Sequence, residues 1–159
     1  MQVYLNAPLE PGSAPQPAAA IVAAAADISD AELNYSPQSI DVVEDIVDGF
    51  RAEGVSGEEM SESLIAFGCY LGEIVTRHIG GVWRLAPAAH PTAAPFVVEL
   101  SDARECHPID WVFSRLESGA AVSIRRLYAA AAVGGADSGF TEERDARVIT
   151  CRRLSGLER

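Results

Sequence analysis

The chain contains no lysine, and its first basic residue is Arg51. All 12 basic residues are arginine, against 23 acidic residues, so the formal net charge is −11. Residues 1–83 hold 13 acidic residues and two arginines, which accounts for the whole excess, because residues 84–159 hold ten of each sign. A surface this acidic disfavours nucleic acid and anionic membranes as partners, since both are polyanions. It would attract a basic protein.

Cysteine is scarce as well. Cys69, Cys106 and Cys151 form an odd set without paired spacing, which predicts reduced thiols in a cytoplasmic protein and no disulfide framework. The spacing of the cysteines and the three histidines fits none of the usual zinc patterns. We therefore expect neither a metal nor a cofactor.

Long apolar runs are missing too. The most apolar stretch, residues 18–27 (AAAIVAAAAD), is too short to span a bilayer, and no Lys or Arg precedes it. We expect neither a membrane segment nor a secretory leader. The length of 159 residues favours one domain with one core.

The first third of the chain divides at about residue 33. Residues 7–17 are rich in Pro, Gly and Ser, which is typical of a linker, and an alanine-rich stretch follows. We predict that residues 1–33 form an N-terminal arm with a short alanine-rich helix. Residues 34–159 are predicted to form a single globular domain.

Two strong helices open this domain. Ser36 is a good N-cap with Pro37 after it, and apolar residues then recur every three or four positions until Gly54. Ser56 and Glu59 have the spacing of a capping box, which predicts the start of a second helix. Its apolar stripe consists of Met60, Leu64, Phe67, Leu71 and Ile74. The short connection predicts an antiparallel helical hairpin.

The pattern then changes to strands. Residues 82–86 and 95–100 are rich in branched and aromatic side chains, and a terminal strand is predicted within residues 145–156. Two more helices are expected, one from Pro108 to about residue 117 and one over residues 121–133. The predicted fold class is α+β: an antiparallel helical hairpin packed on a small antiparallel sheet, with two further helices.

Gly68 and Gly72 lie inside the second predicted helix, where each costs roughly 0.5–1 kcal/mol relative to alanine. One interpretation is close packing, with the strand from Val82 or the helix after Pro108 as the neighbour. The other is a ligand pocket. That pocket would be lined by Gly68, Tyr70, Gly72, Glu73, Trp83 and Arg84.

Glu73 is the polar residue beside these glycines. It could point into such a pocket with Arg84 or Arg77 as its partner. The simpler interpretation is a surface ion pair with Arg77, four residues later on the same helix.

No catalytic constellation emerges. Cys69 or Cys106 could pair with a histidine as a nucleophile, but a reactive thiolate needs an electropositive and accessible setting. Cys69 lies mid-helix in the acidic half, and neither cysteine belongs to a recognisable nucleophile signature. The predicted set of catalytic residues is empty.

Three segments together resemble a family of small, uncharacterised bacterial domains. The segments are NYSPQSIDVVEDIV, FGCYLGEIVTRHIGGVW and HPIDWVFSRLESG, and the family pairs a YS-x-x-S helix start with a YLGE…GG-x-W segment. The resemblance covers roughly residues 34–128. Matching positions are Tyr35, Ser36, Ser39, Tyr70, Leu71, Gly72, Glu73, Gly80, Gly81, Trp83, Pro108 and Gly119. It implies one domain with a helical hairpin beside a small sheet, and it brings no established activity with it.

The acidic first half favours a non-enzymatic interaction protein that binds a basic protein partner, as immunity or inhibitor proteins do. The expected partner-binding residues are Asp41, Glu44, Asp45, Asp48, Glu58, Glu59 and Glu62. The alternative is a small-molecule-binding protein or pathway enzyme with its pocket near Gly72 and Glu73. A homo-oligomeric structural protein is the third hypothesis.

Overall fold

A computed structural model describes residues 10–86, 96–133 and 151–153. The α+β class is confirmed. The elements in chain order are η1 (Pro11–Ser13), α1 (Pro15–Ser29), η2 (Pro37–Ser39), α2 (Ile40–Ala52), α3 (Ser61–His78), β1 (Val82–Leu85), β2 (Phe96–Glu99), β3 (Arg104–Cys106), α4 (Pro108–Ser118), η3 (Gly119–Ala121), α5 (Ile124–Val133) and β4 (Cys151–Arg153).

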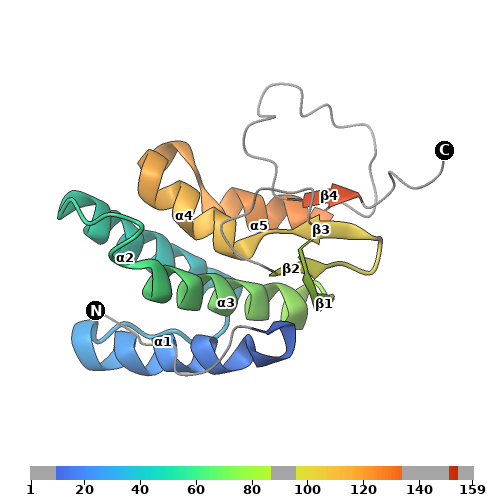
Figure 1. The fold of residues 1–159 in the computed structure, drawn as a ribbon, viewed down its shortest axis with the longest axis horizontal. Coiled ribbons are helices and arrows are strands. Elements are labelled where there is room, and N and C mark those ends of the chain that lie inside the picture. Colours follow the sequence, from blue (N-terminus) through green and yellow to red (C-terminus); the bar gives the residue numbers. More distant parts are fainter. Residues whose placement is uncertain (1–9, 87–95, 134–150, 154–159) are drawn as a thin grey trace.

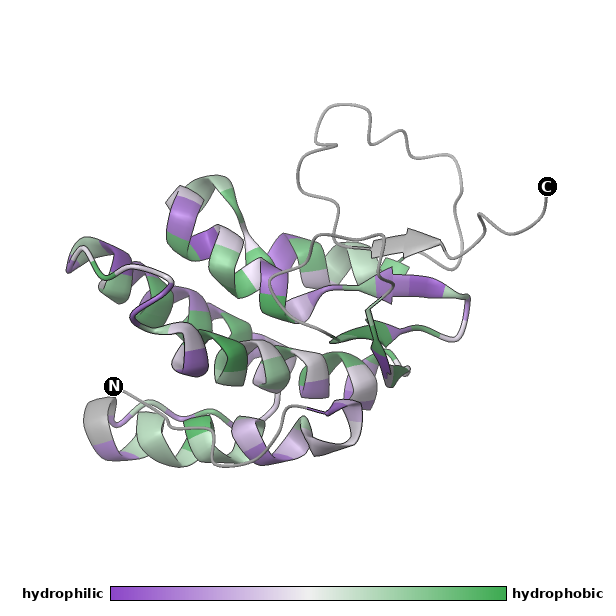
Figure 2. Cartoon of the chain, in the orientation of Figure 1, coloured by the Kyte–Doolittle hydropathy of each residue, from purple (hydrophilic) through white to green (hydrophobic). Residues whose placement is uncertain are grey.

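Helix α3 lies at the centre, with α1 along one side and α4 along the other (Figure 1). Its predicted stripe is buried, but so is most of the rest of the helix: between Leu64 and Val75 every residue except Ile65 is buried. A helix enclosed on all sides must be apolar or small all round. The expectation of one buried stripe was therefore too narrow. Figure 2 shows hydrophobic residues recurring along the helices between hydrophilic ones.

Helix α1 packs directly on α3. Ala14, just before its first turn, and Ala18, Ile21 and Ala25 are fully buried. Alanine at three of these four positions lets the two helix axes approach closely, because the inter-axial distance follows the size of the contact residues. The alanine-rich helix is thus part of the core. The described part of the expected linker, residues 10–17, forms η1 and the first turn of α1.

Both predicted caps between α1 and α3 are formed. The Ser36 hydroxyl accepts a hydrogen bond from the Ser39 amide at 3.3 Å, although this first turn is a 3-10 helix. Ser56 and Glu59 form a reciprocal capping box, with backbone-to-side-chain bonds of 3.0 and 3.2 Å. Regular helix begins only at Ser61, after a turn.

The two helices of the predicted hairpin, α2 and α3, are joined by residues 53–60. They touch through the rings of Phe50 and Phe67, whose centroids lie 6.4 Å apart. α2 packs more closely on α4 than on α3, and α3 packs mainly on α1 and α4. The hairpin is therefore held together largely through α4.

The strands form one antiparallel sheet in the order β1-β2-β3-β4. The strands predicted at residues 82–86 and 95–100 are present as β1 and β2, and the terminal strand is present over its described residues, 151–153. β3 was not predicted, because it is three residues long and two of them are charged. α5 begins at Ile124 and not at residue 121, since the Ser123 hydroxyl accepts from the Arg126 amide at 3.3 Å.

No helix within the described ranges is long and apolar enough to cross a bilayer.

Close packing explains both glycines of α3. A Cβ on Gly68 would lie 2.4 Å from the Cα of Ile109 in α4, and a Cβ on Gly72 would lie 2.1 Å from the Trp83 ring in β1. Both neighbours named from the sequence, the helix after Pro108 and the strand from Val82, are therefore confirmed. Each glycine lets one element approach α3 at a distance that no side chain permits.

Replacing Gly68 with alanine tests this packing. The added methyl group meets backbone of α4, which cannot swing aside as a side chain could, so we expect Gly68→Ala to destabilise the fold by about 1–3 kcal/mol. Gly49→Ala is the matched control, because Gly49 lies in α2 and nothing approaches its Cβ position within 4 Å. It should stabilise by about 0.5–1 kcal/mol. Urea unfolding of both variants measures the difference, and equal effects would contradict the account.

Candidate functional site

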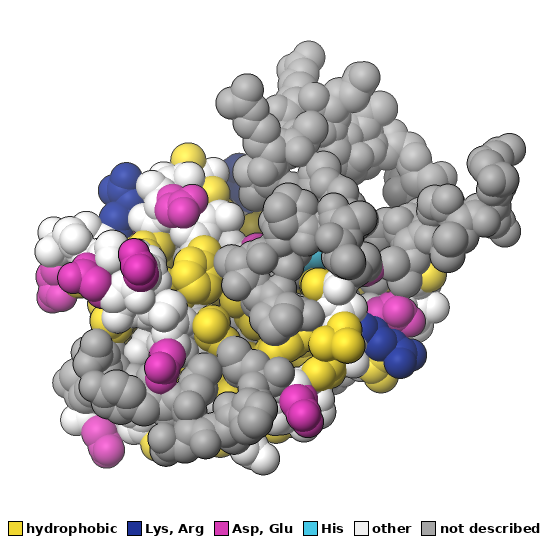
Figure 3. Space-filling view, in the orientation of Figure 1, with side chains coloured by type: hydrophobic (Ala, Val, Ile, Leu, Met, Phe, Trp, Pro, Cys, Tyr) yellow, Lys and Arg dark blue, Asp and Glu magenta, His cyan; other side chains and the backbone are white. Residues whose placement is uncertain are grey.

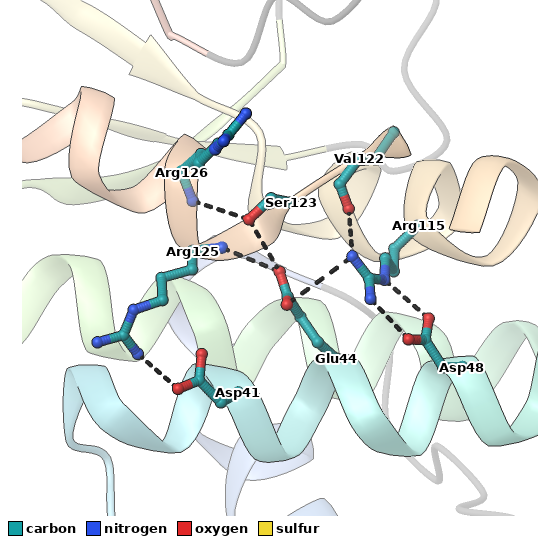
Figure 4. A network of polar contacts seen from close by, with 8 residues as sticks. All are labelled: Asp41, Glu44, Asp48, Arg115, Val122, Ser123, Arg125 and Arg126. Carbon is teal, nitrogen blue, oxygen red and sulfur yellow. Dashed lines mark hydrogen bonds and ion pairs between the residues drawn. The ribbon is translucent and has the colours of Figure 1, made fainter. Parts of the chain in front are cut away.

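Three of the seven predicted partner-binding carboxylates face arginines of the same chain (Figure 4). Asp48 of α2 receives two hydrogen bonds from Arg115 of α4, at 2.8 and 2.6 Å. The side chain of Arg115 is only 8% exposed, and its third contact is a 2.7 Å bond to the Val122 carbonyl. The hydrogen bonds with Asp48 raise the pKa of Arg115, against the opposing effect of burial.

Glu44 and Asp41 continue this contact toward α5. One oxygen of Glu44 lies 3.8 Å from Arg115, and the other accepts from the Arg125 amide at 3.1 Å and from the Ser123 hydroxyl at 3.4 Å. Asp41 pairs with the Arg125 guanidinium at 2.8 Å. These carboxylates therefore join α2 to the connection between α4 and α5. We call Asp41, Glu44, Asp48, Arg115 and Arg125 the α2 clamp.

The other four predicted partner-binding residues are exposed: Asp45, Glu58, Glu59 and Glu62. Asp45 lies on α2, and the remaining three lie in the turn and first residues leading into α3. Glu59 also serves the capping box, and its hydrogen bonds with Ser56 lower its pKa. This second set presents carboxylates to solvent.

Glu73, the residue that packing could not explain, is buried at 8% exposure. Its Oε1 accepts a 3.1 Å hydrogen bond from the indole Nε1 of Trp83, and its Oε2 lies 3.5 Å from Arg77. The predicted Arg77 pair is thus present, but one partner is buried. Arg84 points elsewhere: it is 60% exposed and lies 3.7 Å from Glu99.

Tyr70 of α3 binds the segment that leads into α2, close to Glu73 and Trp83. Its hydroxyl accepts from the Tyr35 amide at 3.0 Å and lies 2.6 Å from the Ser39 hydroxyl, which is buried. Burial raises the pKa of Tyr70, so it is a neutral phenol at physiological pH. Tyr35 has a positive φ of 60°, and its ring lies under the Arg77 guanidinium at 3.8 Å.

The structure therefore brings together only some of the six residues that were predicted to line a pocket. Tyr70, Glu73 and Trp83 belong to one network that also includes Tyr35, Ser39 and Arg77. Gly68 and Gly72 face Ile109 and Trp83, which occupy the room that the glycines leave. The predicted pocket region is therefore filled by packed side chains that bond to one another.

A second buried polar group lies where β3 meets α4. The Nε2 of His107 is 3.7 Å from Glu105, and its Nδ1 is 3.5 Å from Asp110. Because opposite ring nitrogens face the two carboxylates, the three side chains do not converge on one point. Within the described ranges, no group of three or more His, Cys, Asp or Glu is arranged to hold a metal ion.

The cysteine alternative is disfavoured for Cys69. Burial in α3 raises the pKa of this thiol to about 12, and the carboxylate of Glu73 adds to the effect. The nucleophilic form is the thiolate, which is then almost absent at neutral pH. Cys106 is also buried, with no exposed surface.

Arginine partners are the part of the site that sequence reasoning missed. Arg115 and Arg125 follow the acidic helix by more than sixty residues, and no local spacing links them to it. The balanced charge of residues 84–159 was the available signal, since arginines in that half had to face carboxylates somewhere.

Comparison with protein-family models, with curated proteins and with solved structures gives no match. The resemblance to small bacterial domains stays a prediction.

The bond between Trp83 and Glu73 can be measured with a double-mutant cycle. Trp83→Phe removes the indole donor and Glu73→Met removes the acceptor while keeping the chain length. We expect a coupling of about 1 kcal/mol in the free energy of unfolding, because the acceptor is a buried carboxylate. Additivity within about 0.3 kcal/mol would show that the bond contributes nothing to the fold.

Proposed function

We propose that this chain is a non-enzymatic interaction protein whose acidic surface binds a basic protein partner. The observation that carries the proposal is that most of the acidic side chains between positions 10 and 76 are exposed to solvent and do not face an arginine of the chain. There are 13 of them and a single arginine, Arg51, in this range. Four carboxylates face arginines of the chain: Asp41, Glu44, Asp48 and Glu73. The other nine are all exposed.

Several of the nine gather at one end of the molecule. α1 and α3 pack together and run in opposite directions, so the end of α1 lies beside the start of α3 (Figure 1). We call this the acidic end, made of Asp27, Asp30, Glu53, Glu58, Glu59 and Glu62. Figure 3 shows acidic side chains over this region, toward the left of the view.

Two members of the acidic end lie where helix physics disfavours them. Asp27 is in the last turn of α1 and Asp30 is its C-cap, and this turn contains no basic residue. Negative charge near a helix C-terminus is unfavourable by typically 0.3–1 kcal/mol, because the exposed carbonyl groups there are already negative. A local conflict of this kind supports a role in binding a cation-bearing surface.

The α2 clamp narrows the surface proposed from the sequence. Glu44 and Asp48 face the buried Arg115 and help to hold α2 on α4, whereas Asp41 and its partner Arg125 are about half exposed, at 57% and 49%. Asp45, Glu58, Glu59 and Glu62 remain as the partner-binding part of the original set. The matching surface on the partner would be rich in Arg or Lys, and association would be fast and sensitive to salt.

The test is a pull-down with immobilised chain at increasing salt, using three forms of the protein. The Glu58→Gln/Glu62→Gln variant removes two charges from the acidic end. The matched control, Glu32→Gln/Glu117→Gln, removes two exposed charges that lie outside the acidic end. We expect a basic partner that is retained at low salt by the wild type and the control, and lost from the first variant.

Thermal unfolding should be nearly the same for all three forms, because exposed carboxylates contribute little to stability. A partner that is neutral or acidic, or retention that is equal for the two variants, would overturn the proposal.

A further inference from the structure

The sheet places two of the three cysteines opposite each other. In the antiparallel pair of β3 and β4, Cys106 is the register partner of Cys151. Cys106 is fully buried, and β4 is the edge strand of the sheet. In the sequence the two residues are far apart, at positions 106 and 151, so no local spacing suggests the pair.

The hydrogen-bond pattern shows which kind of pair this is. The Arg104 carbonyl accepts from the Leu100 amide at 2.8 Å, so the backbone groups of Arg104 are directed to the β2 side of β3. Bonding direction alternates along an antiparallel strand. Cys106, two residues later, is therefore also directed toward β2, and Glu105 is directed toward β4. Glu105 and Arg152 form the hydrogen-bonded pair, and Cys106 and Cys151 form a non-hydrogen-bonded pair.

This distinction decides whether a disulfide fits. In a non-hydrogen-bonded antiparallel pair the two Cα atoms lie about 4.5 Å apart, and in a hydrogen-bonded pair about 5.5 Å. Disulfides join residues whose Cα atoms are about 4.4–6.8 Å apart. The backbone register alone thus brings the two cysteines within bonding range without any rearrangement of the sheet.

We propose that Cys106 and Cys151 form a reversible cross-strand disulfide that fastens β4 to the sheet when the protein meets an oxidant of the small-molecule disulfide class. One cysteine thiolate attacks the oxidised glutathione disulfide, forming a mixed disulfide and releasing one reduced glutathione. The second thiolate attacks the protein sulfur of that mixed disulfide and releases the second glutathione. The two protein thiols are oxidised by two electrons, and one glutathione disulfide is reduced to two thiols.

The position of the pair at the sheet edge makes the exchange feasible. Cys106 is fully buried, so the exchange requires a local opening of the sheet, and an edge strand opens at a lower free energy than the sheet interior. Once formed, the bond encloses residues 107–150, which include α4 and α5. Closing a loop of this length restricts the unfolded chain, so the oxidised form should melt higher by about 5–15 °C.

The experiment uses the full chain equilibrated with glutathione buffers from fully reduced to fully oxidised, then unfolded and alkylated. Reduced protein should take up three alkyl groups and oxidised protein one, on Cys69. Trypsin cleaves after arginine, so the bond should join the peptides 105–115 and 148–152. That linked peptide should vanish on reduction. Cys69→Ser should leave it unchanged.

Cys151→Ser is the main negative control, because Cys106→Ser changes a buried residue and its folding is less assured. In Cys151→Ser the oxidised and reduced samples should melt at the same temperature. Three free thiols at every glutathione ratio, a bond that includes Cys69, or disulfides only between chains would each overturn the proposal.

Discussion

The close approach of two elements to α3 is the constraint on which the rest of the structure depends. Gly68 admits the backbone of α4, and Gly72 admits the Trp83 ring of β1. With α1 on the opposite side, α3 is enclosed by helices and sheet together. The cost of two glycines inside a helix is roughly 1–2 kcal/mol in all. It is offset by the burial that close packing allows, since the large side chains of Trp111, Tyr70 and Phe67 are among those almost wholly removed from water.

The same packing explains why the face of α3 near β1 carries polar side chains. Glu73 could not be buried without a donor, and the Trp83 indole supplies it from the strand that Gly72 admits. Tyr70 likewise fixes the chain at Tyr35 and Ser39. The helix start at Ser36 and the tyrosine, glycine, glutamate and tryptophan of the later motif thus form one connected structure. It needs no ligand to account for it.

The fold divides the acidic side chains of the first half into two groups: those that pair with arginines of the chain and those that face solvent. The α2 clamp uses carboxylates of the acidic half against arginines of the balanced half, so it fixes α2 on α4 and α5. The acidic end is exposed: Glu59 in it caps the start of α3, whereas Asp27 and Asp30 oppose the dipole of α1. Because of this division, the surface proposed for a partner is smaller than the one that the sequence suggested.

Local signals predicted most of the fold. The caps at Ser36 and at the Ser56–Glu59 box are bonds between near neighbours, so their spacing was sufficient to predict the turns that lead into α2 and α3. What could not be predicted depends on distant partners: the burial of α1, the enclosure of α3 on every side, strand β3, and the arginines of the α2 clamp. A charged strand such as β3 has no apolar alternation, and only pairing with β2 and β4 defines it. Glu73 was identified as the open question, but its donor could be assigned only once Gly72 was seen against Trp83.

Native-state hydrogen exchange tests the central role of α3 most directly. If this helix is the enclosed core, the amides from Leu64 to Val75 should be the slowest in the chain and should exchange only through global unfolding. Their free energy of exchange should then equal the free energy of unfolding measured with urea. Exchange of α3 at a lower free energy than α2 or α5 would contradict the account, because the helix could then open while its neighbours remained folded.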